Sequence, residues 1–253
     1  MPRFFITGSS DGLGLLTAQR LLSRGHSVVL HARSSARADE TRAKCPKAEV
    51  ILIGDLTSLE ETKALAAEAN RFGPYDAVLH NAGVYLGMER VPGKSGLPSL
   101  FAVNTLAPYI LTCLIDKPKR LLFVSSGMHR SGRVNVDGDE EKLLRSDYSD
   151  SKLHDVMLAK VFARRWKDVA SFSADPGWVP TKMGGRSAPE NIDDGVNTFV
   201  MAALGEGDAT SANTGAYFKK SRVHDSSSLA KDEALQERLV KELERISGVK
   251  IPE

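Results

Sequence analysis

The chain has 253 residues, with 34 basic and 32 acidic side chains, a net charge of +2 and two cysteines. This balance lacks the basic excess that binding to a phosphate backbone requires, so we expect no nucleic-acid partner. Two cysteines cannot form a disulfide framework, and neither has neighbours at metal-ligand spacing, so we expect no metal site. The apolar region 100–115 falls short of the ~20 residues that cross a bilayer, and no signal peptide is recognisable, which predicts a cytoplasmic protein without a membrane span.

Short apolar runs alternate with helical patterns along the whole chain, which is typical of repeated βαβ units. Seven runs have the length of buried strands: Arg3–Thr7, Ser27–Ala32, Val50–Ile53, Ala77–His80, Leu121–Ser125, Ala170–Ala174 and Ala216–Lys219. Helical spacing occurs at Leu13–Arg24, Leu59–Arg71, Ser99–Ile115, Ser149–Trp166 and Ile192–Leu204. A final amphipathic helix runs from Leu235 to Gly248, with Glu237 and Lys241 paired on its polar side. The pattern predicts one α/β domain over 1–253, a doubly wound parallel sheet of about seven strands with helices on both faces.

The first predicted strand runs directly into the glycine-rich turn 7–14, T-G-S-S-D-G-L-G, and a helix follows at once. A sharp turn of this kind brings backbone N–H groups and a helix N-terminus against a pyrophosphate, and glycine leaves room for that approach. The spacing differs from the G-x-G-x-x-G fingerprint, so an ordinary βα turn is the alternative interpretation. We predict a cofactor site there, with contacts from Gly8, Ser10, Gly12, Leu13 and Gly14.

The second predicted strand ends at Ala32 and Arg33, where an NAD enzyme would have an acidic residue for the ribose 2′-hydroxyl. A guanidinium instead pairs with a 2′-phosphate, so Arg33, assisted by Arg37, favours NADP over NAD, which stays possible. Asp11 counts against this preference because its charge lies in the same turn. A surface arginine in a polar loop is the alternative interpretation.

Tyr148 and Lys152 lie four residues apart, on one face of a predicted helix. Free tyrosine has a pKa near 10, and a neighbouring ammonium lowers that pKa toward the range in which tyrosine exchanges protons at neutral pH. Upstream, the apolar strand 121–125 ends in serines, at the sheet edge where open α/β folds bind ligands. There Ser126 is placed to donate a hydrogen bond to a carbonyl oxygen. Each pattern alone is common, and an exposed helix turn and a polar strand end are the alternatives.

Together these motifs resemble the short-chain dehydrogenase/reductase family over nearly the whole chain. Residues 7–14 match its T-G-x-x-x-G-x-G, residues 148–152 its Y-x-x-x-K, residues 176–181 its P-G-x-V-x-T, and Asn104 its helix asparagine. Residues 80–83 match N-N-A-G except for the first position, where we expect His80 to be structural. The polar segment 131–147, residues 215–218 and the final helix resemble the retinol-dehydrogenase-like and WW-domain-oxidoreductase-like branch.

The resemblance implies a Rossmann fold and an oxidoreductase that passes a hydride between a nicotinamide cofactor and the carbonyl or alcohol group of a small molecule. Ser126 would orient the carbonyl, Tyr148 would exchange the proton, Lys152 would hold the ribose, and Asn104 would hold a relay water. Further cofactor contacts are implied for Asp55, Leu56, Asn81, Ala82, Gly83, Pro176, Gly177, Val179 and Thr181. Family members often form homodimers or homotetramers through the helices that hold Asn104 and Tyr148.

Two alternatives remain open. Residues 178–191 contain two adjacent glycines and several polar residues, so they form either a mobile lid, with Trp178 and Met183 as its apolar contacts, or a plain surface loop. The same fold could also serve a cofactor-binding sensor or scaffold without catalysis. The presence of serine, tyrosine and lysine favours the enzyme, since a sensor needs no proton donor.

Overall fold

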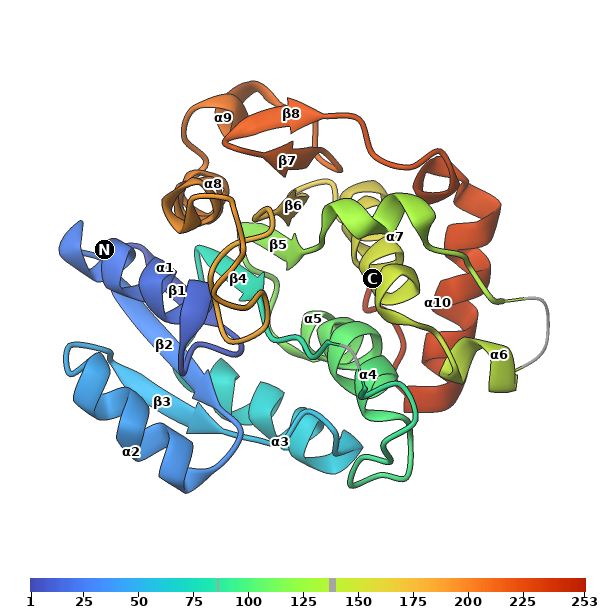
Figure 1. Ribbon diagram of the computed structural model, residues 1–253, viewed down its shortest axis with the longest axis horizontal. Helices are drawn as coiled ribbons and strands as arrows, with labels where there is room; N and C mark the ends of the chain where they lie inside the picture. Colours follow the sequence, from blue (N-terminus) through green and yellow to red (C-terminus); the bar gives the residue numbers. More distant parts are fainter. Residues whose placement is uncertain (86, 137–139) are drawn as a thin grey trace.

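A single eight-stranded sheet runs through the computed structural model, which describes residues 1–85, 87–136 and 140–253 (Figure 1). The strands are β1 (Arg3–Ile6), β2 (Ser27–Ala32), β3 (Val50–Ile53), β4 (Ala77–His80), β5 (Arg120–Val124), β6 (Ala170–Asp175), β7 (Tyr217–Lys219) and β8 (Arg222–His224). Their order is β3-β2-β1-β4-β5-β6-β7-β8, and only the β7 and β8 pair is antiparallel among the pairs described. The chain order reverses between β1 and β4, which is the point where doubly wound sheets bind their ligands.

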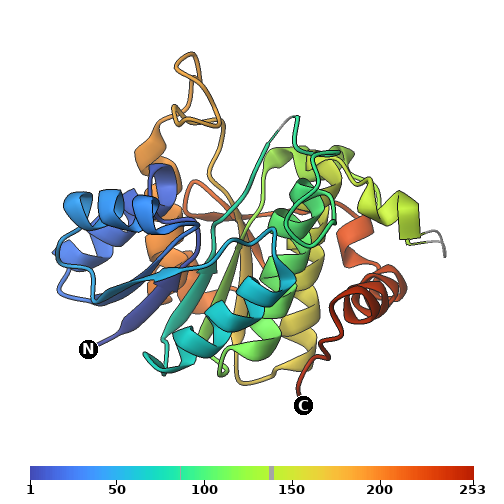
Figure 2. The ribbon, with the colours of Figure 1, turned by 90° about the horizontal axis from the view of Figure 1, so that it is seen from below.

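Helices cover both faces of the sheet (Figure 2). One face carries α1 (Gly12–Ser23), α2 (Ser35–Lys44) and α8 (Ile192–Leu204), and the other carries α3 (Leu59–Asn70), α5 (Ala107–Leu114) and α7 (Tyr148–Arg165). Each face has its own hydrophobic cluster, because successive strand side chains point to opposite sides. Phe4 and Ile6 of β1 lie in one cluster and Phe5 in the other. This arrangement confirms the predicted doubly wound fold.

The remaining helices are short or lie outside these two layers. They are α4 (Ser99–Phe101), α6 (Glu140–Leu144), α9 (Asp208–Ser211), α10 (Glu233–Ser247) and the single turns η2 (Gly127–Ser131) and η3 (Leu229–Lys231). In the described parts of the chain, no helix combines the length and apolarity needed to cross a membrane.

The hydrophobic pattern does not predict α2, α6 or β8. Only Ala38 and Thr41 of α2 are buried, so the helix has no apolar stripe, although Ser34 caps its N-terminus by accepting a hydrogen bond from the Arg37 N–H. Strand β8 is three exposed residues long and follows a two-residue turn, Lys220 and Ser221, whose φ angles are +48° and +58°. Such left-handed turns favour glycine and asparagine, so this hairpin has no sequence signal.

The predicted helix 99–115 is helical throughout but contains a π-helical turn, η1 (Ala102–Leu106), which includes Asn104. Pro108, in the first turn of α5, has no N–H to donate to the Asn104 carbonyl four residues earlier. The Ala107 N–H bonds to the Ala102 carbonyl, five residues back. Single π-helical turns are frequent at functional sites, and this one carries a residue implied in catalysis.

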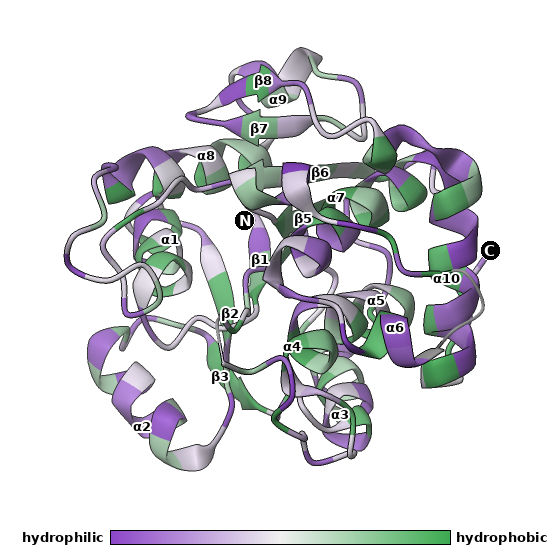
Figure 3. Cartoon of the chain, turned by 45° about the vertical axis from the view of Figure 1, so that its right-hand side comes forward, coloured by the Kyte–Doolittle hydropathy of each residue, from purple (hydrophilic) through white to green (hydrophobic). Residues whose placement is uncertain are grey.

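Helix α10 packs against α7 and closes the side of the molecule away from α1 (Figure 3). Hydrophobic and hydrophilic residues alternate along it, and its apolar side joins the cluster of α5 and α7 through Leu239, Val240 and Leu243. It ends at Gly248, as predicted, in a left-handed conformation with φ +67°.

Ion pairs hold α10 to α7. The carboxylate of Glu237 binds Arg164 and Arg165 of α7. Glu237 therefore pairs with another helix instead of the expected Lys241 of its own helix. Beyond α10, the Tyr109 hydroxyl of α5 donates to the Val249 carbonyl (2.8 Å). The side of α7 that α10 covers is therefore not available to a second copy of the chain.

His80 ends β4 and is buried against α5. The Thr112 hydroxyl donates to the Pro108 carbonyl (2.7 Å), so the His80 Nε2–H must donate to Thr112 Oγ1 (2.8 Å). Nδ1 is then an acceptor without a partner among the described residues. Burial lowers the pKa of His80 to about 3, because a proton on Nδ1 would be a buried, unpaired charge. The neutral ring joins the sheet to α5.

We predict that His80→Asn reduces the acid sensitivity of the fold. The unfolded chain protonates this histidine below pH 6.5 and the folded chain only near pH 3, so stability is lost as the pH falls between these values, by about 1.4 kcal/mol per pH unit. Urea titrations from pH 7 to pH 4 should show a shallower pH dependence of the unfolding free energy in the variant. His224→Asn, at an exposed position on β8, is the control, and equal slopes for His80→Asn and the wild type would contradict the prediction.

Candidate active site

Residues that directly follow β4 hold the glycine-rich turn 7–14 in place. Thr7 Oγ1 accepts hydrogen bonds from the N–H groups of Asn81 and Ala82 (3.0 Å each). The Asn81 side-chain amide donates to the carbonyls of Thr7 (2.9 Å) and Gly8 (3.0 Å). Gly8 has φ +61°, and a Cβ there would lie 2.6 Å from the Ala82 Cα. Asn81 and Ala82, implied as cofactor contacts, therefore also shape the turn itself.

His31 of β2 also supports this turn and was not anticipated from the sequence. Its Nδ1 accepts from the Gly8 N–H (3.0 Å), so Nε2 carries the hydrogen and donates to the Gly54 carbonyl (2.7 Å). Burial lowers the pKa of His31, which keeps this neutral tautomer at physiological pH. The one sequence signal is a histidine inside the apolar strand S-V-V-L-H-A.

The N-terminus of α1 suits an anion. The N-cap residue, Asp11, makes no side-chain hydrogen bond to the first turn, so the helix amides there are left for a ligand. Its carboxylate instead binds Arg37 and Lys182 (2.8 Å each). Burial opposes ionisation of Asp11, but the two cations outweigh it and hold its pKa below the usual value. The predicted contacts Ser10, Gly12, Leu13 and Gly14 all lie in or beside this turn, so the donor set fits a dinucleotide pyrophosphate.

The ends of β2 and β3 lie side by side, with Ala32 paired to Ile53. Arg33 follows Ala32 as an exposed side chain with no ion pair to any described residue. Asp55 follows β3, and its Oδ1 accepts from the N–H (3.0 Å) and hydroxyl (2.8 Å) of Thr57. Leu56 beside it is buried. Arg33 and the implied adenine contacts therefore occupy one edge of the sheet.

Tyr148 and Lys152 occupy the first two turns of α7. The helix starts sharply because Asp147 and Asp150 form a reciprocal capping box. The buried Lys152 ammonium donates to the Val124 carbonyl at the end of β5 (2.7 Å) and to Asp155 Oδ2 (2.8 Å). It lies 5.6 Å from the centre of the Tyr148 ring. Two of its three donors are thus used, and one is left for a ligand.

The surroundings of Tyr148 favour its neutral phenol form. Burial raises its pKa, and Lys152 lowers it only in part, while Asp155, Tyr85 and Asp175 add to the increase. The sequence predicts the effect of Lys152 correctly in direction but not the larger effect of burial. Asp155, one turn beyond Lys152 and almost fully buried, was not anticipated from the sequence either. A protonated tyrosine is the form that donates a proton.

The two serines after β5 have different surroundings. The Ser125 hydroxyl is buried and donates to the Lys152 carbonyl (2.7 Å), so it joins β5 to α7. Ser126 is half-buried, and its Oγ accepts from the Met128 N–H (3.2 Å) at the start of η2. Its own hydroxyl hydrogen is left to donate, which distinguishes Ser126 as the serine suited to bind a carbonyl oxygen.

Asn104 joins three parts of the site. Its side-chain amide donates to the Val84 carbonyl (3.0 Å) and to Ser151 Oγ (3.1 Å), and its Oδ1 accepts from the Val84 N–H (2.8 Å). A Cβ on Gly83 would lie 3.6 Å from Asn104 Oδ1 and 3.8 Å from Lys152 Nζ. Gly83, Asn104 and Lys152 are thus brought together, and the relay water implied for Asn104 stays a prediction.

The segment 176–191 links β6 to α8 and stands away from the sheet (Figure 2). It begins at Pro176 and Gly177, where the Gly177 N–H donates to Asp175 Oδ1 (2.8 Å). Its base is closed by hydrogen bonds from the Trp178 N–H to Glu190 Oε1 (2.8 Å) and from the Glu190 N–H to the Trp178 carbonyl (3.1 Å). The Trp178 indole donates within the segment, to the Gly184 carbonyl (2.8 Å).

The same segment reaches both halves of the site. Val179 is buried, and the Thr181 methyl lies 3.6 Å from where a Cβ on Gly12 would be. Lys182 binds Asp11 of the glycine-rich turn, and Met183 Sδ lies 3.9 Å from the Tyr148 hydroxyl. Of the two expected apolar lid residues, Met183 therefore contacts the predicted proton donor, and Trp178 packs within its own segment.

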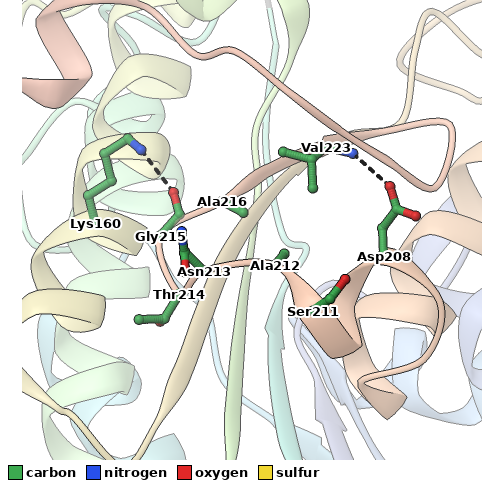
Figure 4. A pocket seen from close by; sticks show the side chains of 9 residues that line it. All are labelled: Lys160, Asp208, Ser211, Ala212, Asn213, Thr214, Gly215, Ala216 and Val223. Carbon is green, nitrogen blue, oxygen red and sulfur yellow. Dashed lines mark hydrogen bonds between the residues drawn. The ribbon is translucent and has the colours of Figure 1, made fainter.

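A cavity of about 570 Å³ lies elsewhere, between α7, α9 and the β7–β8 hairpin (Figure 4). Lys160 donates there to the Gly215 carbonyl (2.8 Å), and Asp208 accepts from the Val223 N–H (3.3 Å). Its residues Thr214 and Gly215 precede β7, whereas Tyr148 and Lys152 lie near the carboxyl ends of the strands. The cavity is therefore separate from the candidate site.

Residues 3–191 match the family described as short chain dehydrogenase. The chain belongs to this family. The short-chain dehydrogenase chyC of Penicillium rubens is 44% identical to this short-chain dehydrogenase, with 100% of both chains covered. An uncharacterized oxidoreductase of Emericella nidulans is 46% identical over 100% of this chain and 99% of its own. Human retinol dehydrogenase 14 is 31% identical over 71% of this chain and 62% of its own.

Solved structures share the fold of this short-chain dehydrogenase at lower identity. Carbonyl reductase Sniffer of Drosophila melanogaster has a TM-score of 0.67 and 21% identity, covering 87% of this chain and 97% of its own. A blue fluorescent protein from a metagenomic library, in complex with NADPH, has a TM-score of 0.64 and 20% identity, covering 86% and 95%. Family membership makes this protein an NAD(P)-dependent oxidoreductase.

We predict that Asp155→Ala destabilises this short-chain dehydrogenase by about 3–5 kcal/mol, because it leaves the Lys152 ammonium buried without a counter-ion. Urea unfolding at pH 7.5 measures the loss. The double variant Lys152→Met with Asp155→Leu should recover most of it, since it removes both charges. Glu206→Ala breaks the exposed pair with Arg24 and should cost less than about 1 kcal/mol. Equal losses for Asp155→Ala and Glu206→Ala would rule out the buried pair as a source of stability.

Proposed function

We propose that this short-chain dehydrogenase is an NADP-preferring reductase that converts the carbonyl group of a small molecule into an alcohol. The observation that carries the proposal is the placement of Tyr148 one helical turn before the buried Lys152, whose ammonium lies 5.6 Å from the centre of the Tyr148 ring. Burial raises the pKa of Tyr148, which favours the neutral phenol. Two contacts support the assignment of Ser126 to the same site: its neighbour Ser125 donates to the Lys152 carbonyl, and Met128, two residues later, contacts Tyr85, whose ring packs on Tyr148.

In this mechanism, Ser126 donates a hydrogen bond to the carbonyl oxygen and orients the substrate. Bound NADPH would supply the hydride to the carbonyl carbon. As negative charge develops on the oxygen, Tyr148 transfers its phenolic proton to it and forms the alcohol. Lys152 stabilises the tyrosinate that remains, and its third N–H is available to a ribose hydroxyl.

The preference for NADP rests on the charges at the ends of β1 and β2. Arg33 is exposed and has no described ion-pair partner, so its guanidinium is available to a 2′-phosphate. Asp11, which would repel that phosphate, is neutralised by Arg37 and Lys182. Ala32 stands where a carboxylate would favour the ribose hydroxyl of NAD.

We expect Arg33→Ala to raise the Kd of NADPH by about 10- to 100-fold, the equivalent of roughly 1.5–3 kcal/mol for hydrogen bonds to a charged group. The Kd of NADH should stay unchanged, because NADH has no 2′-phosphate. Fluorescence titration of the protein with each cofactor measures both values. Equal losses for the two cofactors would count against the role of Arg33.

We expect Tyr148→Phe to lower kcat by about 10²- to 10⁴-fold, the usual contribution of a positioned general acid. NADPH binding should be retained, since the ring and Lys152 remain in place. NADPH oxidation on a panel of aldehydes and ketones, with a parallel cofactor titration, separates the two effects. A fully active Phe variant would refute the role of Tyr148, and a wild type that binds NADPH but reduces nothing would be a sensor.

A further inference from the structure

Three side chains with apolar or sulfur surfaces form a connected set of contacts at Tyr148: Tyr85 and Met183 contact Tyr148, and Met128 contacts Tyr85. Tyr85 lies between β4 and α4, Met128 belongs to η2, and Met183 belongs to the segment between β6 and α8. We call these three residues the apolar rim. They come from three loops that meet only in the folded chain.

The rim contacts the proposed proton donor directly. The Tyr85 ring stands edge-on to the Tyr148 ring, with centroids 4.5 Å apart and planes at 86°. The Tyr85 hydroxyl faces Met128 Sδ, and the Tyr148 hydroxyl faces Met183 Sδ, each at 3.9 Å. Thioethers are weak acceptors, so a carbonyl oxygen that displaces Met183 from Tyr148 gains a stronger hydrogen bond than the one it replaces.

Both methionines are open to solvent. Met128 is 40% exposed and Met183 is 42% exposed, although both are large apolar side chains. Exposed apolar surface beside a reactive group indicates a ligand-binding site, because burying this surface under a ligand is favourable by about 25 cal/mol per Å². The exposed methionines therefore offer the substrate hydrophobic contact, Met183 beside the Tyr148 hydroxyl and Met128 beside Tyr85.

Two lysines beside the rim are already paired. The Lys152 ammonium near Tyr148 binds Asp155, and Lys182, next to Met183, binds Asp11. A carboxylate or phosphate on the substrate would have to break one of these pairs to be neutralised. This distribution of charge favours an uncharged substrate.

We infer that this short-chain dehydrogenase takes uncharged carbonyl compounds that carry an aromatic ring next to the carbonyl group. The inference rests on the proposed reductase function and extends it to the substrate class. The ring would pack against Tyr85, where aromatic pairs are favourable in edge-on or offset geometry, and against the methionine sulfurs, which make favourable contacts with aromatic edges. Methionine side chains adapt their shape, so the rim suits rings of different size.

Three matched ketones test this substrate class with NADPH: 1-phenylethanone, its saturated counterpart 1-cyclohexylethanone, and the charged 4-acetylbenzoate. Of the two aromatic ketones, we expect 4-acetylbenzoate to be reduced more slowly than 1-phenylethanone. We expect Tyr85→Ala to lower kcat/KM for the phenyl ketone by roughly two- to tenfold more than for the cyclohexyl ketone, the equivalent of one lost aromatic contact. For each ketone, the effect is the ratio of the wild-type to the variant kcat/KM. Comparing these two ratios removes the difference in intrinsic reactivity between the ketones.

Control variants separate the ring from its hydroxyl and from general surface effects. Tyr85→Phe keeps the ring and should keep the phenyl-to-cyclohexyl ratio of kcat/KM. Met128→Gln and Met183→Gln should weaken the binding of both ketones, because each places an amide in the apolar rim. Leu229→Gln changes an equally exposed apolar residue, on η3, and should alter neither ketone. Circular dichroism confirms that each variant is folded.

The outcomes distinguish the proposed reductase function from the proposed preference for aromatic substrates. If the wild type oxidises NADPH with none of the carbonyls of a broad panel, the reductase function fails. If carbonyls are reduced but Tyr85→Ala affects the two ketones equally, or 4-acetylbenzoate is the best substrate, the aromatic preference is overturned and the reductase function stands. Calorimetry of 1-phenylethanone with the NADP⁺-loaded protein, which cannot reduce the ketone, gives a readout independent of turnover, and rim binding predicts weaker binding in Tyr85→Ala.

Discussion

The buried ammonium of Lys152 is the interaction on which the site depends. It joins the end of β5, through the Val124 carbonyl, to α7, through Asp155, and the Ser125 hydroxyl closes the same junction by donating to the Lys152 carbonyl. A buried charge of this kind is costly unless every strong partner is in place. The register between β5 and α7 is therefore closely defined, and with it the positions of Tyr148 and Ser126 at the sheet edge.

The same junction decides the protonation state of the site. Burial favours the neutral phenol of Tyr148, and Lys152 opposes burial less effectively because Asp155 shares its charge. In the proposed mechanism, this arrangement makes Tyr148 a proton donor next to a cation that can stabilise its conjugate base. In the part of the site around the glycine-rich turn, His31 and Thr7 hold the turn without any net charge, so the positive end of α1 stays available to phosphate.

The site has a polar floor and an apolar mouth. Hydrogen bonds of Asn81, Asn104 and Lys152 tie the floor to the sheet and to α7. The mouth is formed by the apolar rim, whose two methionines are exposed and make only weak contacts to the two tyrosine hydroxyls. A rigid floor suits a reaction shared by many relatives, whereas loop side chains at the mouth suit the selection of one substrate class.

The sequence by itself determined the sheet, the order of its elements and the positions of the motifs, because the patterns that encode them are local. Alternating apolar runs predict strands and helices, and the spacing of Tyr148 and Lys152 follows from one helix. Helix α2 and strand β8 escaped prediction because one lacks an apolar stripe and the other is short and exposed. Only the tertiary structure decided which serine is free and that the carboxylate of Asp155 pairs with Lys152. It also decided that Tyr85 and Met183 contact Tyr148, and that Met128 contacts Tyr85. These contacts join residues far apart in the chain, so no local pattern records them.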